Sequence, residues 1–270
     1  MWYRRWTNDR VVTVRTSQQI KRTIFAHFPL VRAIALTAVR RVRRIIRVPH
    51  QKHYAALRLI IDNPDDLYLD IGANRGQSIE SIRLYKPNPI ISFEVNPLVG
   101  QVLKAQYPDQ TVHVVGLGKV AGEFTLYVPA YKHTLFDARA SIRRVEVERF
   151  LAQRPVYWFK PELARVESLA CSVRTLDSFG LTPFLVKIDM EGTEEDVIDG
   201  GMRTIQQHLP ILIVEQATKE ILSKLEPLGY KRYGYIGGEL IEGAYGTGDV
   251  FVVPDGKRHL VERAERVGPG

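Results

Sequence analysis

The stretch YLDIGANRGQS, residues 68–78, places an acid at the end of an apolar run and follows it with a glycine-rich turn. The apolar residues around Asp70 predict a short buried strand. Gly72 and Gly76 allow a tight turn and let the backbone approach a ligand closely. A helical pattern follows, and the N–H groups at the start of a helix bind acidic groups. The stretch therefore predicts a strand, a turn and a helix, with a ligand site at the turn.

Short apolar runs alternate with helical patterns along the rest of the chain. Strands are predicted at residues 67–71, 90–95, 111–116, 123–129, 184–189, 211–216, 230–236 and 249–254, and helices at residues 77–85, 98–105 and 193–207. Near-continuous apolar strands are typical of a parallel sheet that is covered on both faces. The sequence predicts an α/β fold with a doubly wound, mostly parallel sheet, in which the last two strands form an antiparallel pair.

The positive charge is concentrated at the N-terminus. The chain has 270 residues and a formal net charge of +8, and residues 1–50 alone carry +11, so that the rest totals −3. We predict a basic N-terminal extension, residues 1–50, and a main domain, residues 51–270, with an insertion at about residues 130–170. Because the main domain is not basic, no nucleic-acid partner is expected.

Residues 31–47 are typical of a basic amphipathic helix. Apolar residues recur there at helical spacing, and five arginines lie between positions 40 and 47. Such a helix can lie on an anionic membrane surface, or its apolar face can pack on the main domain. No secretory signal or membrane-spanning stretch is visible, and the single cysteine, Cys171, favours a reducing compartment. We expect a cytoplasmic protein, which is in peripheral contact with the membrane if the helix at 31–47 lies on the membrane surface.

The ends of the first two predicted strands indicate the ligand. Asp70 can accept a hydrogen bond from an ammonium group, while the following turn can bind a carboxylate, so together they suit an amino acid moiety. Glu94 ends the second strand, where an acid can accept hydrogen bonds from ribose hydroxyls. An amino acid beside a ribose indicates S-adenosylmethionine. A nicotinamide dinucleotide is disfavoured, because Asn74 replaces a glycine of the G-x-G-x-x-G fingerprint and no tyrosine has a lysine four residues later.

Three carboxylates follow two later strands. Asp189 and Glu191 lie just beyond the strand at 184–189, and Glu215 ends the strand at 211–216. At the ligand end of the sheet, one of them can act as a general base, or all three can hold a divalent cation such as Mg²⁺. Alternatively, Glu191 caps the next helix and Glu215 pairs with an arginine. His133, in the insertion, is a further candidate base or substrate contact.

Several segments together resemble a known family. The segments LYLDIGANRGQSIESI, ISFEVNP, VVGLGKVAGEFTLYV, VRTLDSFG, LVKIDMEGTEEDVIDGG and IVEQ occur in order over about residues 66–220. In these segments the chain resembles the FkbM family of S-adenosylmethionine-dependent methyltransferases. The resemblance implies a Rossmann-like methyltransferase fold and, most often, O-methylation of sugars, glycolipids or macrolide-like natural products.

The resemblance also implies roles for individual residues. It assigns the methionine part of the cofactor to Asp70, Gly72, Ala73, Asn74 and Gly76, the ribose to Glu94, and the adenine side to Asn96, Gly116 and Leu117. Ser141 lies in a loop that is similar to a family segment near the substrate.

The expected function is O-methylation of a sugar hydroxyl on a glycolipid or polysaccharide. Two alternatives stay open: a methyltransferase that acts on a soluble natural product, and a membrane-associated adaptor that keeps a degenerate methyltransferase fold without catalysis. The sequence also leaves open a homodimer.

Overall fold

The computed structural model describes residues 18–28, 31, 35, 38–39, 46–190, 192–215, 217–246 and 248–261. The chain forms two compact units. Unit 1 comprises residues 1–45 and 124–170, and unit 2 comprises residues 46–123 and 171–270. The N-terminal segment and most of the predicted insertion therefore belong to the same unit.

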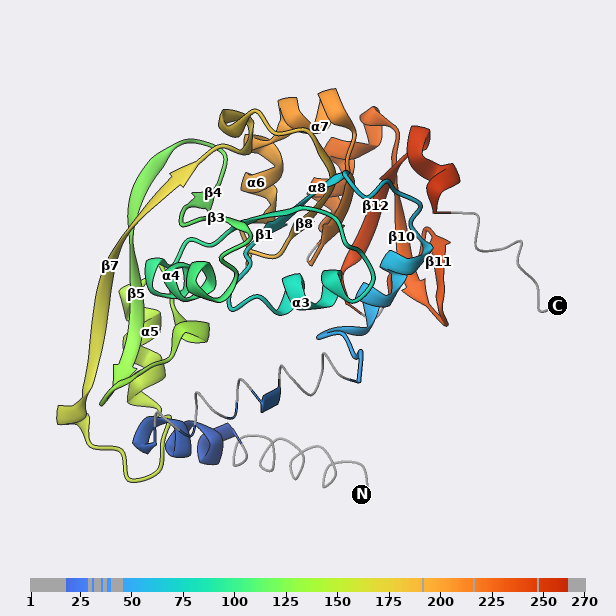
Figure 1. Ribbon diagram of the computed structural model, residues 1–270. Coiled ribbons are helices and arrows are strands. Elements are labelled where there is room, and N and C mark those ends of the chain that lie inside the picture. The colour runs from blue at the N-terminus through green and yellow to red at the C-terminus, as the bar shows by residue number, and fades with distance from the viewer. Residues whose placement is uncertain are drawn as a thin grey trace, which may run out of the picture. The chain divides into compact units, whose positions relative to one another are not determined.

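Unit 2 is built on an eight-stranded sheet in the order β11-β10-β12-β9-β8-β1-β2-β3 (Figure 1). Its strands are β1 (Leu67–Ile71), β2 (Ile90–Phe93), β3 (Thr111–His113), β8 (Pro183–Ile188), β9 (Ile211–Val214), β10 (Tyr230–Ile236), β11 (Glu239–Glu242) and β12 (Val250–Pro254). The five neighbouring strands β3, β2, β1, β8 and β9 run parallel, whereas β12 pairs antiparallel with both β9 and β10. The predicted mostly parallel sheet with its antiparallel C-terminal pair is confirmed.

Helices cover both faces of this sheet. They are η1 (Lys52–Leu59), α3 (Gln77–Arg83), α4 (Pro97–Gln106), η4 (Leu176–Phe179), α6 (Glu194–Gly200), α7 (Met202–His208), α8 (Lys219–Leu225), η5 (Glu226–Leu228) and η6 (Asp255–Leu260). Residues of η1, α3 and α4 contribute to one apolar cluster, and residues of α6, α7 and α8 to another. The arrangement is doubly wound, as predicted.

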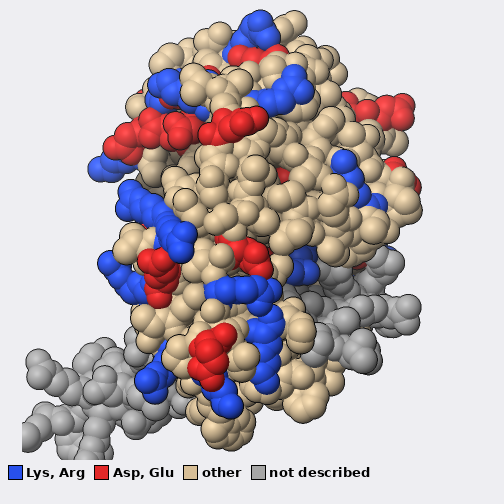
Figure 2. All heavy atoms as spheres, turned by 90° about the vertical axis from the view of Figure 1, so that its left-hand side faces the viewer, with Lys and Arg blue, Asp and Glu red and all other residues tan. Residues whose placement is uncertain are grey.

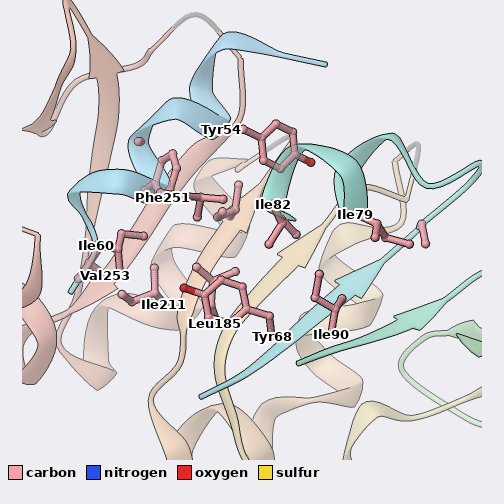
Figure 3. Packing of buried hydrophobic residues seen from close by; sticks show 14 of the residues in the cluster. Tyr54, Ile60, Tyr68, Ile79, Ile82, Ile90, Leu185, Ile211, Phe251 and Val253 are labelled. Atoms are coloured by element: carbon pink, nitrogen blue, oxygen red, sulfur yellow. The ribbon is translucent and has the colours of Figure 1, made fainter. Parts of the chain in front are cut away.

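Alternation along the strands explains the two clusters. Successive side chains of a strand point to opposite faces, so Tyr68 lies in the first cluster while Leu69 and Ile71 lie in the second. Figure 3 shows the first cluster, in which Tyr68 and Leu185 from the sheet pack below the helices that carry Tyr54, Ile79 and Ile82. All these side chains are at most 2% exposed. The burial of both faces fixes the register of β1, because a slip by one residue would exchange its faces.

A second sheet, in the order β4-β7-β5-β6, was not predicted. Its strands are β4 (Gly116–Leu117), β5 (Gly122–Tyr131), β6 (Thr134–Leu135) and β7 (Ala164–Arg174). The strand predicted at 123–129 belongs to this sheet. Gly116, the last residue of the strand predicted at 111–116, lies outside β3 and belongs to β4. β7 has alternating exposure over much of its length, unlike the largely buried strands β8 and β9, whereas β5 is mostly exposed in its first half and mostly buried in its second. That alternation is typical of a sheet with one solvated face.

Unit 1 joins distant parts of the chain. Residues 18–27 are helical, and the insertion adds η2 (Asp137–Arg139), α5 (Arg144–Ala152) and η3 (Pro161–Leu163). The hydroxyl of Thr23 accepts a hydrogen bond from the N–H of Tyr157 at 2.8 Å, and Thr134 donates to the carbonyl of Phe25 at 2.9 Å. Ala26 packs with buried aromatic and aliphatic side chains of the insertion. The first described helix is therefore part of the unit that contains the insertion.

The predicted helix at 31–47 lies mostly outside the described residues. Val31, Ala35, Ala38 and Val39, which are described, are helical. Among the described residues, no helix has both the length and the apolar character needed to cross a membrane. On the face shown in Figure 2, basic and acidic side chains of the described residues lie interspersed.

The helix predicted at 193–207 divides into α6 and α7 at Gly201. Thr193 and Asp196 have the spacing of a capping box but do not form one. The side chain of Thr193 makes no capping bond but donates to the carbonyl of Met190 at 3.2 Å. Glu194, which is only 3% exposed, accepts from the N–H groups of Met190 and Gly192 instead. Glu194 therefore holds the loop that follows β8.

Candidate functional site

The turn after β1 is held by backbone hydrogen bonds. The N–H groups of Gly72 and Ala73 both donate to the carbonyl of Phe93 at 3.0 Å, and Gly76 donates to Ala73 at 2.8 Å. Gly72, Asn74 and Gly76 all have positive φ, at 78°, 46° and 82°. Positive φ is unfavourable for residues with a side chain, and Asn tolerates it better than most. The pattern D-x-G-x-N-x-G therefore matches the backbone that the turn requires.

Glu94 connects this turn to the end of β2. One carboxylate oxygen accepts from the N–H of Asn74 and the other from the N–H of Asn96, each at 2.8 Å. The side chain is only 8% exposed, and burial raises the pKa of Glu94 although both backbone bonds act in the opposite direction. Each oxygen retains a second acceptor position, which suits a ribose hydroxyl. Asn96 also caps α4 by accepting from the N–H of Leu98 at 3.1 Å.

Asp70 has a partner that the sequence analysis missed. The Nζ atom of Lys187 lies 3.3 Å from Asp70 Oδ1 and 3.3 Å from Asp189 Oδ2. Ser78 donates to the other oxygen of Asp70 at 2.5 Å, and Asp70 is completely buried. The predicted contact between Asp70 and an amino group of the ligand stays a prediction. The structure shows that Asp70 also neutralises a buried lysine.

Lys187 is the cation at the centre of this cluster. Its side chain is 1% exposed, and Nζ also lies 3.1 Å from the carbonyl oxygen of Gly72. Burial acts to lower the pKa of Lys187, but Asp70 and Asp189 together raise it above its ordinary value. The lysine therefore carries a charge and ties the ends of β1 and β8 together. A lysine inside the apolar run FLVKID was the sequence signal that could have revealed it.

Two of the three predicted carboxylates end neighbouring strands. The N–H of Asp189 donates to the carbonyl of Ile71 at 3.2 Å, and the N–H of Glu215 donates to that of Ile188 at 3.1 Å. The hydrogen bonding between β1 and β8 therefore extends to Asp189, and that between β8 and β9 extends to Glu215. The side chain of Asp189 is 30% exposed. Glu191 lies outside the described residues.

A second buried pair, His53 and Asp249, was also missed. Nε2 of His53 lies 3.2 Å from Asp249 Oδ2, and the side chains are 1% and 2% exposed. The N–H of Asp249 donates to Nδ1 of His53 at 3.4 Å, so Nδ1 is the acceptor and Nε2 carries the proton. Burial, followed by Lys187, lowers the pKa of His53 to about 4. Burial, followed by Asp189, raises the pKa of Asp249 to about 6.

We expect Asp249→Asn to make stability more dependent on pH. Between pH 4 and 6 the folded pair holds one proton on Asp249, and the unfolded pair holds one on His53, so their proton counts cancel. In the variant, His53 binds a proton below pH 6.5 in the unfolded state but not in the folded state, and the asparagine at position 249 offers no compensating site. The free energy of unfolding should then fall, relative to wild type, by up to about 1.4 kcal/mol per pH unit as the pH drops from 6.5 towards 4.

Urea denaturation of both proteins at several pH values measures this slope. The matched control is Asp65→Asn, which removes an exposed acid. Parallel pH profiles for wild type and Asp249→Asn would contradict the expected exchange of the proton within the pair.

A family model described as the methyltransferase FkbM domain matches residues 70–236, more than half of the chain. The chain belongs to the FkbM methyltransferase family. This match begins at Asp70 and includes the glycine-rich turn, Glu94, Lys187, Asp189 and Glu215. Membership of the FkbM family supports a methyltransferase that depends on S-adenosylmethionine and has a Rossmann-like fold.

The solved structures that match this FkbM-family chain have low sequence identity to it. The methyltransferase FkbM from Methylobacillus flagellatus KT is 18% identical with a TM-score of 0.46, over 74% of this chain and 47% of that one. A TehB-like SAM-dependent methyltransferase from Corynebacterium glutamicum is 11% identical with a TM-score of 0.37, over 82% and 96% of the two chains. A SAM-dependent O-methyltransferase from Thermotoga maritima is 10% identical with a TM-score of 0.31, over 70% and 59%. The chain thus spans about half the length of the first of these proteins, and no curated protein matches it.

The remaining predicted residues of this FkbM-family chain lie in both units. In unit 2, Gly116 and Leu117 form β4 and are buried, beside Val173 and Arg174 of β7. In unit 1, His133 is exposed in the turn between β5 and β6. Ser141 bridges to Tyr127 and donates to Glu146 at 2.6 Å, near the start of α5. The roles predicted for these four residues stay predictions.

The predicted divalent cation is likewise untested. Within the ranges that the structure describes, no group of three or more His, Cys, Asp or Glu side chains is placed to hold a metal ion. Glu191, one of the three predicted ligands, is outside those ranges.

Proposed function

We propose that this FkbM-family protein transfers a methyl group from S-adenosylmethionine to a sugar hydroxyl of a glycolipid or polysaccharide. The observation that carries the proposal is the place of Asp189, directly beyond β8 and beside the turn that follows β1. The backbone of Asp189 bonds to Ile71, and its carboxylate lies 3.3 Å from Lys187. An acid is therefore fixed at the edge of the expected cofactor site.

The residues present suit the cofactor. Glu94 has acceptor positions for a ribose. The glycine-rich turn lies beside it at the end of β1, and the bonds that its N–H groups make to Phe93, Ala73 and Glu94 hold its backbone in place. When bound, the sulfonium group supplies an activated methyl group. The chain must then hold the acceptor oxygen in line with that methyl group, since such positioning provides much of the rate enhancement.

Removal of a proton from the acceptor is the remaining requirement. A sugar hydroxyl is a weak nucleophile, and a carboxylate within reach can accept its proton as the new C–O bond forms and the C–S bond breaks. We assign this role to Asp189, because its partly exposed carboxylate is oriented by Lys187. Glu191 and Glu215 are the alternatives, and a divalent cation held by these acids is a second way to activate the hydroxyl.

A lipid-linked acceptor is supported by unit 1. On the helix of residues 18–27, Ile20 and Ile24 are 46% and 41% exposed, and Phe28 just beyond is 59% exposed. Their spacing of four residues puts them along one side of the helix. Together with the +11 charge of residues 1–50, this apolar stripe suits a peripheral contact with an anionic membrane. A cytoplasmic membrane surface is therefore our proposed place of action.

The test uses radiolabelled S-adenosylmethionine and an extract of the source cells, with products partitioned into lipid and aqueous phases. We expect label in the lipid phase, and a loss of about 10²–10⁴-fold for Asp189→Asn with unchanged binding of S-adenosylhomocysteine. Glu239→Gln, at an exposed position on β11, is the control for loss of one negative charge. The same assay with EDTA tests the divalent cation.

The other outcomes discriminate between the alternatives. Label in the aqueous phase would favour a soluble natural product or a free polysaccharide. Bound cofactor without any transfer would favour a non-catalytic adaptor and contradict the proposal. Full activity of Asp189→Asn would move the base to Glu191 or Glu215.

A further inference from the structure

A hollow of about 250 Å³ lies in unit 2 beside the carboxyl end of β9. Glu215 and Thr218 line it from the end of β9 and the start of α8, and Tyr245, Gly246 and Val250 line it from the segment that leads into β12. β9 is the direct neighbour of β8, whose end carries Asp189. The hollow is therefore one strand away from the proposed base.

The acidic side of the hollow is anchored by the sheet. Val214 pairs with Ile188 of β8 on one side and with Val250 of β12 on the other. The N–H of Glu215 continues this ladder by donating to the carbonyl of Ile188. Thr218 is fixed as the cap of α8, where its hydroxyl accepts from the N–H of Ile221 at 3.3 Å. The backbone positions of both polar residues are thus set by regular structure.

The aromatic side of the hollow is held by an arginine. The guanidinium carbon of Arg232 lies 3.6 Å from the ring centre of Tyr245, so one face of the ring is covered. Arg232 also donates to the carbonyl of Gly243, and its own carbonyl accepts from the N–H of Gly243 at 2.8 Å. Tyr245 nevertheless remains 60% exposed. A largely exposed aromatic side chain with an arginine over one face of its ring therefore borders the hollow.

We propose that this hollow binds the sugar ring of the acceptor, with the ring face of Tyr245 opposite Arg232 against the C–H face of a pyranose and Glu215 accepting from its hydroxyls. A pyranose combines one apolar face with several hydroxyl donors, and the hollow offers a matching aromatic surface and a carboxylate. Its volume is just below the usual range for ligand sites, which suits one monosaccharide better than a macrolide. This inference rests on the proposed function and assigns its substrate class to named residues.

The experiment is saturation-transfer NMR on the full chain with S-adenosylhomocysteine present. The probes are the methyl pyranosides of glucose, galactose, mannose, rhamnose, fucose and xylose. We expect transfer to the ring protons of at least one probe. Its dissociation constant should rise at least tenfold in Tyr245→Ala, return towards the wild-type value in Tyr245→Phe, and rise in Glu215→Gln. Ile241→Ala, an exposed position on β11, should bind like wild type.

Calorimetry with S-adenosylhomocysteine distinguishes failure of the sugar subsite from failure of the proposed function. A wild-type protein that binds S-adenosylhomocysteine but none of the pyranosides would overturn the subsite and leave the proposed transfer reaction standing. The same holds if Tyr245→Ala binds the pyranoside as tightly as wild type does. A protein that does not bind S-adenosylhomocysteine would overturn the proposed function and the subsite together.

Discussion

An alanine at position 72 should destabilise the protein by about 3 kcal/mol or more and abolish binding of S-adenosylhomocysteine. A Cβ atom on Gly72 would lie 1.8 Å from the carbonyl oxygen of Asp189, and φ is +78°. That oxygen cannot easily move away, because the N–H of Asp189 is bonded to Ile71 in the sheet. Overpacking against rigid backbone typically costs about 1–3 kcal/mol, and a positive φ adds about 1–2 kcal/mol for a residue with a side chain.

Gly180→Ala is the matched control for this variant. Gly180 also has a positive φ, +60°, but a Cβ atom there would have no heavy atom within 4 Å. It should therefore show only the backbone cost of about 1–2 kcal/mol and should bind S-adenosylhomocysteine normally. Urea denaturation and calorimetry of both variants make the comparison. Equal losses in the two proteins would show that the contact between Gly72 and Asp189 is unimportant.

Lys187→Met should lower the free energy of unfolding by about 3–5 kcal/mol at pH 7. The substitution keeps the length of the side chain but leaves Asp70, which is completely buried, without its nearby cation. Asp189 loses the same partner. Removing one member of a buried ion pair is costly because the remaining charge stays desolvated. Urea denaturation at pH 7 measures the loss, and methyl transfer should fall with it because Asp189 is no longer oriented.

Two further measurements separate charge from packing. In Lys187→Met the stranded carboxyl groups should bind protons more readily in the folded than in the unfolded state, so the deficit should shrink as the pH falls towards 5. The double variant Lys187→Met with Asp70→Asn should recover part of the loss at pH 7. A deficit that is independent of pH and unaffected by Asp70→Asn would indicate lost packing alone.

Much of the main sheet could be predicted because its signals are local. The strands at 67–71 and 230–236 have the predicted bounds, since apolar runs and flanking turn residues define them without any knowledge of their neighbours. The second sheet was missed because the membership of β5 and β7 depends on pairing between segments about 40 residues apart. The break at Gly201 was missed because the periodic apolar pattern continues through it.

The candidate site was predictable in position but not in its partnerships. Asp70 lies near the end of β1, and Glu94, Asp189 and Glu215 directly follow β2, β8 and β9, so the ends of those strands were sufficient to locate them. Lys187 could not be assigned to Asp70, because that contact exists only when β8 lies beside β1. The same holds for His53 and Asp249, which are 196 positions apart in the chain. Strand order decides such contacts, and sequence spacing alone does not contain it.

The joining of Thr23 to Tyr157 has a consequence for biosynthesis. These residues are 134 positions apart, so at typical elongation rates the first described helix is synthesised roughly 7–27 s before its partner segment. A helix of this length is only marginally stable alone in water. We therefore expect unit 1 to fold late in translation, with the apolar stripe of its first described helix available to a chaperone or to the membrane surface in the interval.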